Sequence, residues 1–243
     1  MAGSGIALVT GGNKGIGFEI CRQLGRAGFV ILLGARNPDL GAEAAARLRR
    51  EAVDARPLAL DVTSAVTISA ATAAIESEFQ RLDVLVNNAG ITGRSGDGPP
   101  SIAGTDTVRR LMETNFIGPL AVTQAMLPLL RKSAAGRIVN VSSGLGSLTL
   151  NGDPDWEFAG VKLLGYNASK AALNMLTVQL AWELRDTTIK VNAADPGFTA
   201  TDLNQHRGTQ TVEEGARAPV RLALLGRDGP SGGYFDAAGR LPW

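Results

Sequence analysis

Two side chains that could handle a proton stand four positions apart in the second half of the chain. Tyr166 and Lys170 lie in the stretch YNASK, and the tyrosine is one of only 2 among 243 residues. Positions four apart on a helix share one face, so both side chains can point into the same cleft. A free tyrosine has a pKa of about 10, and a neighbouring ammonium favours the phenolate and lowers that pKa. The pair is therefore a candidate acid–base device, although the stretch alone favours an ordinary surface pair at a helix start.

A second candidate is the glycine-rich stretch TGGNKGIG, which spans 10–17 and follows a short apolar run. Gly11 permits a tight turn, while Gly15 and Gly17 let backbone approach a pyrophosphate and let a helix pack close to the strand. The amides that open the helix would then point at the phosphates. The alternative is a strand-to-helix turn without a ligand. Its position in the first strand–helix–strand unit favours nucleotide binding.

The elements that must position these residues alternate along the chain. Apolar runs typical of buried strands occupy 5–10, 29–36, 55–62, 82–90, 136–143 and 188–197, and a short one occupies 232–236. Segments with helical spacing lie at 15–28, 40–52, 64–81, 107–132, 166–185 and 211–225, the fourth with a candidate kink at 118–119. The loosest stretches, 92–101 and 146–160, are short enough to be loops within a domain. The pattern predicts one α/β domain over 1–243, a Rossmann fold with a doubly wound parallel sheet of about seven strands and helices on both faces.

Sheets of this kind bind ligands at the carboxyl ends of their strands, and the motifs there resemble those of the short-chain dehydrogenase/reductase family. The first turn has the family's longer spacing T-G-x-x-x-G-x-G. The family's NNAG stands at 87–90, its helix asparagine is Asn115, and its strand-end serine is Ser143. Y-x-x-x-K and the pair Pro196-Gly197 complete the set in order. The motif style is most similar to NADPH-dependent carbonyl reductases and related plant ketone reductases.

The resemblance implies an oxidoreductase that reduces a ketone or aldehyde to an alcohol by hydride transfer from NADPH. It makes Tyr166 the acid and base, and Ser143 a hydrogen-bond donor to the carbonyl oxygen, where negative charge develops. Lys170 would also grip the nicotinamide ribose, and Asn115 would hold a water that relays protons to the lysine. From the residues alone, Asn115 is equally a helix cap or kink residue. Side chains alternate along a strand, so only one of Ser142 and Ser143 should face the cleft, and the family pattern selects Ser143.

The same resemblance implies a set of cofactor contacts. Asp61 and Val62 would meet the adenine, Asn88 the adenosine side, and Thr199 the nicotinamide amide. The full set is Gly11, Asn13, Lys14, Gly15, Ile16, Arg36, Asp61, Val62, Asn88, Ala89, Gly90, Tyr166, Lys170, Pro196, Gly197 and Thr199.

The end of the second strand decides between NADP and NAD. NAD-dependent members place an acid there for the ribose hydroxyls, but residues 34–37 contain none, and Arg36 stands there instead. Lys14 lies inside the glycine turn, and two cations converging on one spot suit a 2′-phosphate. NADP is therefore the predicted cofactor, with Asp39 a little further along as the argument for NAD.

Two segments should form the walls of the substrate-binding site. The first follows Gly144 and holds Trp156 and Phe158 among acidic residues, and the second is a lid around 198–215. Aromatic side chains next to carboxylates favour a neutral or apolar carbonyl compound over an anionic one. His206, the only histidine, is more typical of a solvated lid residue than of a catalyst.

The segment from Ser143 to Tyr166 spans 23 positions, more than is usual in the family. In carbonyl reductases an enlarged segment here can block the usual helix-pair interface. The oligomeric state therefore stays open, from monomer to homotetramer.

Composition argues against several other classes. A formal net charge of +1 gives no indication of nucleic acid or an anionic membrane as a partner. The lone Cys21 permits no internal disulfide and fits a reducing compartment. The sequence shows no signal-peptide pattern and no apolar run of about twenty residues. We expect a cytoplasmic protein with a small-molecule carbonyl substrate, no metal, no nucleic acid and no membrane partner.

Three other functions share part of this pattern. A non-catalytic NADP-sensing regulator typically loses the tyrosine or the lysine, and both are present here. An epimerase or dehydratase of the extended family usually has a different glycine spacing and a longer substrate domain. A 3-oxoacyl-carrier ketoreductase has nearly the same motifs and stays an alternative.

Overall fold

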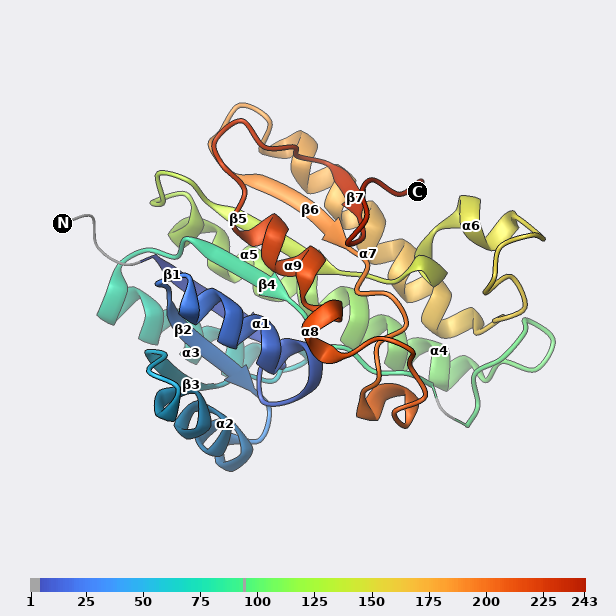
Figure 1. The fold of residues 1–243 in the computed structure, drawn as a ribbon, viewed down its shortest axis with the longest axis horizontal. Coiled ribbons are helices and arrows are strands. Elements are labelled where there is room, and N and C mark those ends of the chain that lie inside the picture. Colours follow the sequence, from blue (N-terminus) through green and yellow to red (C-terminus); the bar gives the residue numbers. More distant parts are fainter. Residues whose placement is uncertain (1–4, 94) are drawn as a thin grey trace.

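The apolar segments form one parallel sheet, as the sequence predicts (Figure 1). The computed structural model describes residues 5–93 and 95–243, and within them the sheet has 7 strands. These are β1 (Ile6–Thr10), β2 (Val30–Ala35), β3 (Ala55–Ala59), β4 (Val84–Asn87), β5 (Arg137–Val141), β6 (Lys190–Ala194) and β7 (Gly233–Phe235). Their order is β3-β2-β1-β4-β5-β6-β7, with every neighbouring pair parallel, which confirms the expected Rossmann-type arrangement.

Helices cover both faces of the sheet. On one face pack α1 (Gly15–Arg26), α2 (Pro38–Arg50) and α9 (Arg217–Ala223), and on the other α3 (Ala65–Phe79), α5 (Gly118–Leu130) and α7 (Leu164–Glu183). α4 (Thr105–Met112) extends the second layer along the start of α7. The shorter elements are η1 (Glu113–Ile117), η2 (Gly144–Gly146), α6 (Leu148–Gly152), η3 (Asp202–Asn204) and α8 (Val212–Gly215). In the described ranges, no helix combines the length and the apolar character that crossing a bilayer requires.

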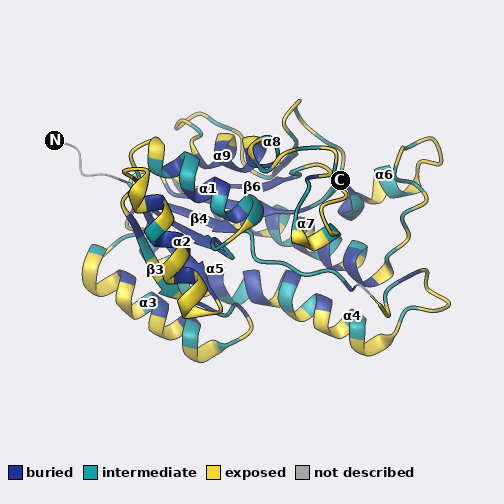
Figure 2. Ribbon diagram, turned by 60° about the horizontal axis from the view of Figure 1, so that its bottom comes forward, coloured by how far each residue is buried: buried dark blue, intermediate teal, exposed yellow. Residues whose placement is uncertain are grey.

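The core is divided in two by the alternation of side chains along the strands. In β1, Ala7 and Val9 join the cluster under α1 and α2, whereas Ile6 and Leu8 join the cluster under α3 and α5. A strand buried on both faces must be apolar throughout, and this explains why these segments are continuous apolar runs in the sequence. Figure 2 shows the buried sheet in dark blue between helices whose outer sides are exposed.

The strand order creates the crevice that holds the site. β1 pairs with β2 on one side and β4 on the other, so that Leu8 lies opposite both Leu32 and Leu85. After β1 the chain forms β2 and β3 on one side of this strand, and it later forms β4 on the other side. A crevice therefore opens at the carboxyl ends of β1 and β4, where the glycine turn and the NNAG turn begin.

The long helix predicted at 107–132 is interrupted by a π-turn rather than simply kinked. In η1 the Gly118 amide donates to the carbonyl of Glu113, five residues back. Pro119 has no N–H to donate to the carbonyl of Asn115, so the regular helical pattern cannot continue through this point. The π-turn displaces the helix surface at Asn115, a predicted site residue.

The prediction of one continuous helix at 211–225 is wrong, because this segment forms two helices, α8 and α9. Pro219 cannot donate to the carbonyl of Gly215, which ends the first helix there. Gly215 in turn packs so closely on Thr199 that a Cβ would lie 2.3 Å from the Thr199 Oγ1.

A chain of buried polar side chains joins the sheet to the helices behind it. The Asn87 amide donates to Thr123 Oγ1 at 3.0 Å and to Asn140 Oδ1 at 2.9 Å. The Asn140 amide donates in turn to Thr177 Oγ1 at 2.9 Å. Buried hydrogen bonds of this kind fix geometry, because an unpaired amide at the same place costs about 1–3 kcal/mol. The network therefore fixes the carboxyl ends of β4 and β5 against α5 and α7.

Candidate active site

The turn between β1 and α1 requires its glycines. Gly11 and Gly15 have φ angles of +64° and +56°, a region that is strained for residues with a Cβ. Gly17 has no room for a side chain, since a Cβ there would lie 2.3 Å from Asn88 Nδ2 and 2.4 Å from the Gly11 carbonyl oxygen. The start of α1 thus presents bare backbone to the crevice, an arrangement that binds anionic groups.

A cavity of about 920 Å³ runs along this edge of the sheet, within the size range of small-molecule and cofactor sites. Its walls come from the glycine turn, the segments after β2, β3 and β4, the start of α7 and the segment after β6. Most of the expected cofactor contacts line it, namely Gly11, Asn13, Lys14, Gly15, Ile16, Arg36, Asp61, Val62, Asn88, Ala89, Gly90, Tyr166, Lys170 and Pro196.

Thr10 and Asn88 lock the glycine turn to the NNAG turn. The Thr10 hydroxyl accepts hydrogen bonds from the backbone amides of Asn88 and Ala89, each at 3.0 Å. The Asn88 side-chain amide donates to the carbonyls of Thr10 and Gly11 at 2.9 and 3.2 Å. Asn88 borders the cavity, but its amide N–H groups are used to hold the turn.

Tyr166 lies on the first turn of α7 and is only 8% exposed. The Ser143 side chain lies beside its hydroxyl as a hydrogen-bonding neighbour. Burial raises the pKa of Tyr166 to about 12, Ser143 lowers it, and the negative charge of Asp195 raises it further. The phenol is therefore protonated at neutral pH.

The structure brings Ser143, and not Ser142, to the tyrosine. Ser143 stands directly after β5 at the start of η2, where its Oγ also accepts from the Leu145 amide at 3.3 Å. The Ser142 hydroxyl points the other way and donates to Asn174 Oδ1 at 2.6 Å. This is the alternation expected of neighbouring residues in extended chain.

Lys170 lies one helical turn after Tyr166 on the same face of α7. Its Nζ donates to the Val141 carbonyl at 2.8 Å and lies 5.8 Å from the centroid of the Tyr166 ring. Burial lowers the pKa of Lys170 to about 8, and the charge of Asp195 acts in the opposite direction. The shared face agrees with the sequence, but the expected lowering of the tyrosine pKa does not. Desolvation dominates because both groups are buried.

Asn115 is fully buried on the π-turn behind the NNAG segment. Its side chain accepts from the Ile91 amide at 2.8 Å and donates to the Ile91 carbonyl at 2.9 Å. It also donates to Ser169 Oγ at 3.0 Å, and that hydroxyl donates to the Tyr166 carbonyl at 2.7 Å. Asn115 thus links the NNAG segment to the first turn of α7.

Comparison with known proteins decides the family. A profile described as short chain dehydrogenase matches residues 5–211. The chain belongs to the short-chain dehydrogenase family. This confirms the resemblance and the oxidoreductase class expected from the motifs.

Relatives of this short-chain dehydrogenase include several named reductases. (−)-Isopiperitenone reductase of Mentha piperita is 35% identical, over 94% of this chain and 95% of its own length. Salutaridine reductase of Papaver bracteatum is 33% identical, over 96% and 94%. The solved structure of NADPH-bound carbonyl reductase from chicken fatty liver has a TM-score of 0.84 at 28% identity, over 99% of each chain. The alignment with isopiperitenone reductase runs over 305 positions, more than the 243 residues of this chain, so that relative carries segments lacking here.

Two expected cofactor contacts of the short-chain dehydrogenase, Gly197 and Thr199, are not among the described residues that line the cavity. Gly197 turns the chain at a φ of +71°. Thr199 is buried against Gly215, and its hydroxyl donates to a backbone carbonyl at 3.0 Å. Thr201 lines the cavity instead, because the chain turns back toward the glycine turn only after Thr199.

The segment 198–211 of the short-chain dehydrogenase lies over the glycine turn, where the sequence predicts a lid. The Lys14 ammonium donates to Asp202 Oδ2 at 2.7 Å, and His206 Nε2 lies 2.9 Å from Asp202 Oδ1. Both ion pairs are exposed, with 53% of the Asp202 side chain accessible. One of the two cations expected at a 2′-phosphate is thus held by a carboxylate of this segment.

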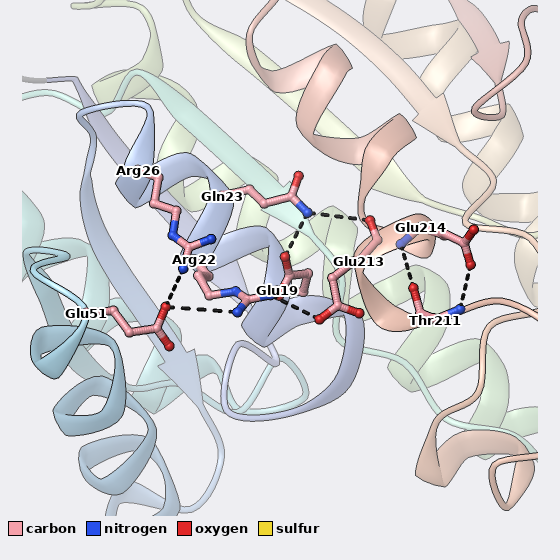
Figure 3. A network of polar contacts seen from close by, with 8 residues as sticks. All are labelled: Glu19, Arg22, Gln23, Arg26, Glu51, Thr211, Glu213 and Glu214. Atoms are coloured by element: carbon pink, nitrogen blue, oxygen red, sulfur yellow. Dashed lines mark hydrogen bonds and ion pairs between the residues drawn. The ribbon is translucent and has the colours of Figure 1, made fainter.

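The helix that follows this segment, α8, is hydrogen-bonded to α1 (Figure 3). Thr211 and Glu214 form a capping box at the start of α8, with bonds of 2.9 and 3.2 Å. Glu213 accepts from the Arg22 guanidinium at 3.0 Å and, through its carbonyl, from the Gln23 amide at 3.5 Å. Because α1 begins at the glycine turn, one helix anchors both the turn and the segment that covers it.

The two predicted substrate walls meet in an aromatic cluster. The rings of Trp156 and Phe158 are 5.5 Å apart, and those of Phe158 and Phe198 are 5.8 Å apart. Trp156 also reaches Gly144, where a Cβ would lie 3.1 Å from its Cζ2. The cluster therefore stands beside Ser143, the neighbour of Gly144 in the chain.

Sequence reasoning missed Asp195, at the end of β6. Its Oδ1 accepts from the Gly197 amide at 2.9 Å, and a Cβ on Gly144 would lie 3.1 Å from its Oδ2. Burial raises the pKa of Asp195, and the neighbouring amides of Gly197 and Gly144 act in the opposite direction. An acid directly before Pro196 at a strand end is the signal that could have found it.

Proposed function

We propose that this short-chain dehydrogenase is an NADPH-dependent reductase of neutral ketones or aldehydes, with Tyr166 as the proton donor. The observation that carries the proposal is a protonated Tyr166 that lines the cavity opened by the glycine turn, together with Lys170 and next to the Ser143 side chain. Two relatives named reductases and a structural neighbour named as an NADPH-bound carbonyl reductase support the reaction class and the cofactor.

The cavity residues fit a dinucleotide with a 2′-phosphate. The bare backbone at Gly15 and Gly17 would receive the pyrophosphate at the start of α1. Lys14 and Arg36, both on the cavity wall, would bind the 2′-phosphate, and Lys170 would bind the nicotinamide ribose. When bound, NADPH supplies the hydride that reduces the carbonyl carbon.

The side chains around Tyr166 would direct a proton to the carbonyl oxygen. The neighbouring hydroxyls of Ser143 and Tyr166 would both donate to that oxygen as negative charge develops on it. A phenol kept protonated by burial suits the acid that reduction needs. The Lys170 ammonium, 5.8 Å from the tyrosine ring, would stabilise the phenolate left after transfer.

We expect ketone reduction to decline as the pH rises through about 8, where Lys170 loses its proton. Asp195→Asn removes a charge that raises the pKa of Lys170, so this decline should move to lower pH. The measurement is kcat against pH at saturating NADPH, with Asp155→Asn, an exposed acid on the aromatic wall, as the control. A decline that stays in place in Asp195→Asn would refute this role for the ammonium.

The acidic and aromatic surroundings of Ser143 favour a neutral substrate. Asp195 lies within electrostatic reach of Tyr166 and would repel the carboxylate of a keto acid. The test is steady-state oxidation of NADPH and NADH with a panel of neutral ketones, aldehydes and keto acids. We expect turnover of neutral compounds with NADPH. Absence of turnover with every carbonyl, or a preference for keto acids, would contradict the proposal.

A further inference from the structure

The helix that carries Tyr166 begins without a cap of its own. Leu163 occupies the cap position of α7 and offers no side-chain hydrogen bond, and the first turn contains no acidic residue. The first amides of a helix have no partner within it, so they need acceptors from elsewhere. Tyr166 is the third residue of this helix, which makes its position depend on how those amides are held.

Asp97, from the loop between β4 and α4, supplies the missing acceptors. Its Oδ1 accepts from the Gly165 amide at 2.8 Å, and its Oδ2 accepts from the Tyr166 amide at 3.0 Å. The next residue of the loop, Gly98, accepts from the Leu164 amide through its carbonyl at 2.9 Å. One loop therefore binds three successive amides at the start of the catalytic helix, and a carboxylate there also suits the helix dipole.

The packing around Asp97 leaves little freedom. A Cβ on Gly93 would lie 2.3 Å from the Asp97 Cβ, and one on Gly165 would lie 2.7 Å from Leu111 Cδ1 and 3.3 Å from Asp97 Oδ1. Gly96 has a φ of +100°. The sequence predicts a loop without regular structure at 92–101, yet the glycines of this loop allow it to approach the helix closely.

The same loop also borders the proposed cofactor site. Ile91, Thr92, Gly93 and Ser95 line the cavity on one side of the loop, while Asp97 holds α7 on the other. The Ile91 backbone is held by Asn115. The segment thus joins the cavity wall to the helix that presents the phenol.

We propose that Asp97 is a positioning residue of the reaction, which holds the first turn of α7 so that the Tyr166 hydroxyl stays at Ser143. Its kinetic consequence rests on the proposed function. Without the carboxylate, the first turn frays and the phenol spends less time in the reactive position. A displacement of about 1 Å in a reacting group can cost about a hundredfold in rate.

The test compares Asp97→Ala, Asp97→Asn and the control Asp106→Ala with the wild type. Asp106 is an acid in the first turn of α4, 96% exposed and paired with Arg109 at 2.7 Å. We expect Asp97→Ala to lower kcat about tenfold to a hundredfold, with NADPH affinity unchanged within about twofold. Asp97→Asn keeps one acceptor oxygen and should give an intermediate kcat. Asp106→Ala should match the wild type.

Amide hydrogen exchange of residues 164–170 gives a readout that does not depend on catalysis. Exchange there should be faster in Asp97→Ala than in wild type and Asp106→Ala, while the core strands stay protected. A wild-type kcat in Asp97→Ala, or unchanged exchange at 164–170, overturns the proposal. If the wild type reduces no carbonyl compound, the proposed function fails, while the exchange result still decides whether Asp97 holds α7. Should Asp97→Ala not fold, Asp97→Asn carries both measurements.

Discussion

Replacing Tyr166 by phenylalanine should lower kcat for NADPH-dependent carbonyl reduction by about a thousandfold, within the range of about 10²–10⁴ typical of a lost general acid. The ring stays in its buried place, so NADPH binding and folding should be retained. The loss follows from the geometry, because the missing hydroxyl is the proton-donating group beside Ser143, on a side chain that lines the cavity. Single-turnover kinetics with pre-bound NADPH would measure the chemical step directly.

The chain offers a matched control for this change in its only other tyrosine. Tyr234 is fully buried and stacks on Trp243 at 5.4 Å, and its hydroxyl has no hydrogen-bond partner among the described residues. Tyr234→Phe removes the same atom and should leave kcat near the wild-type value. Equal losses in the two variants, or wild-type activity in Tyr166→Phe, would remove Tyr166 from the mechanism.

Replacing both Lys14 and Arg36 by alanine should raise the Kd for NADPH about a hundredfold and leave NADH binding nearly unchanged. A hydrogen bond to a charged group contributes about 1.5–3 kcal/mol, so losing two costs about 3 kcal/mol or more. Lys14 must first leave Asp202, but an exposed ion pair of this kind contributes only about 0–1 kcal/mol. The phosphate therefore competes successfully with the carboxylate.

A charge-matched control separates this effect from a general loss of positive charge. Arg131 and Lys132 are half-exposed at the end of α5, paired with Glu183 at 3.8 Å and Glu76 at 3.2 Å. Replacing both by alanine removes the same two charges away from the cavity and should not change NADPH binding. Titration of each variant with NADPH and NADH, followed by fluorescence, gives the four constants. An NADPH-to-NADH preference that survives the loss of Lys14 and Arg36 would place the 2′-phosphate elsewhere.

The strands and the glycine turn could be predicted because their physical causes are local, whereas most of the expected cofactor contacts came from the family resemblance. A strand buried on both faces must be apolar throughout, and the glycine turn needs positive φ at Gly11 and Gly15. Alternation of side chains in extended chain allowed only one of Ser142 and Ser143 to face the cleft, and the family resemblance selected Ser143. Each of these features depends on a few consecutive residues.

The features that were missed depend on contacts between distant parts of the chain. Thr199 and Thr201 look alike in sequence, and only the packing of Gly215 shows that Thr199 is turned inward. The pKa of Tyr166 follows burial rather than its neighbour Lys170, and burial is set by the whole fold. Asp97 caps a helix whose first amides lie 68 and 69 residues further along the chain, so no local pattern could reveal it.

The position of β1 between β2 and β4 has a consequence for the order in which the protein is assembled. As the polypeptide is synthesised, β1, α1 and β2 emerge first, but Thr10 finds the amides of Asn88 and Ala89 only after β4 has docked. Pairing of strands so distant along the chain is slow compared with local folding. The nucleotide pocket is therefore a late product of maturation, and the nascent chain carries the glycine sequence well before it can hold a nucleotide.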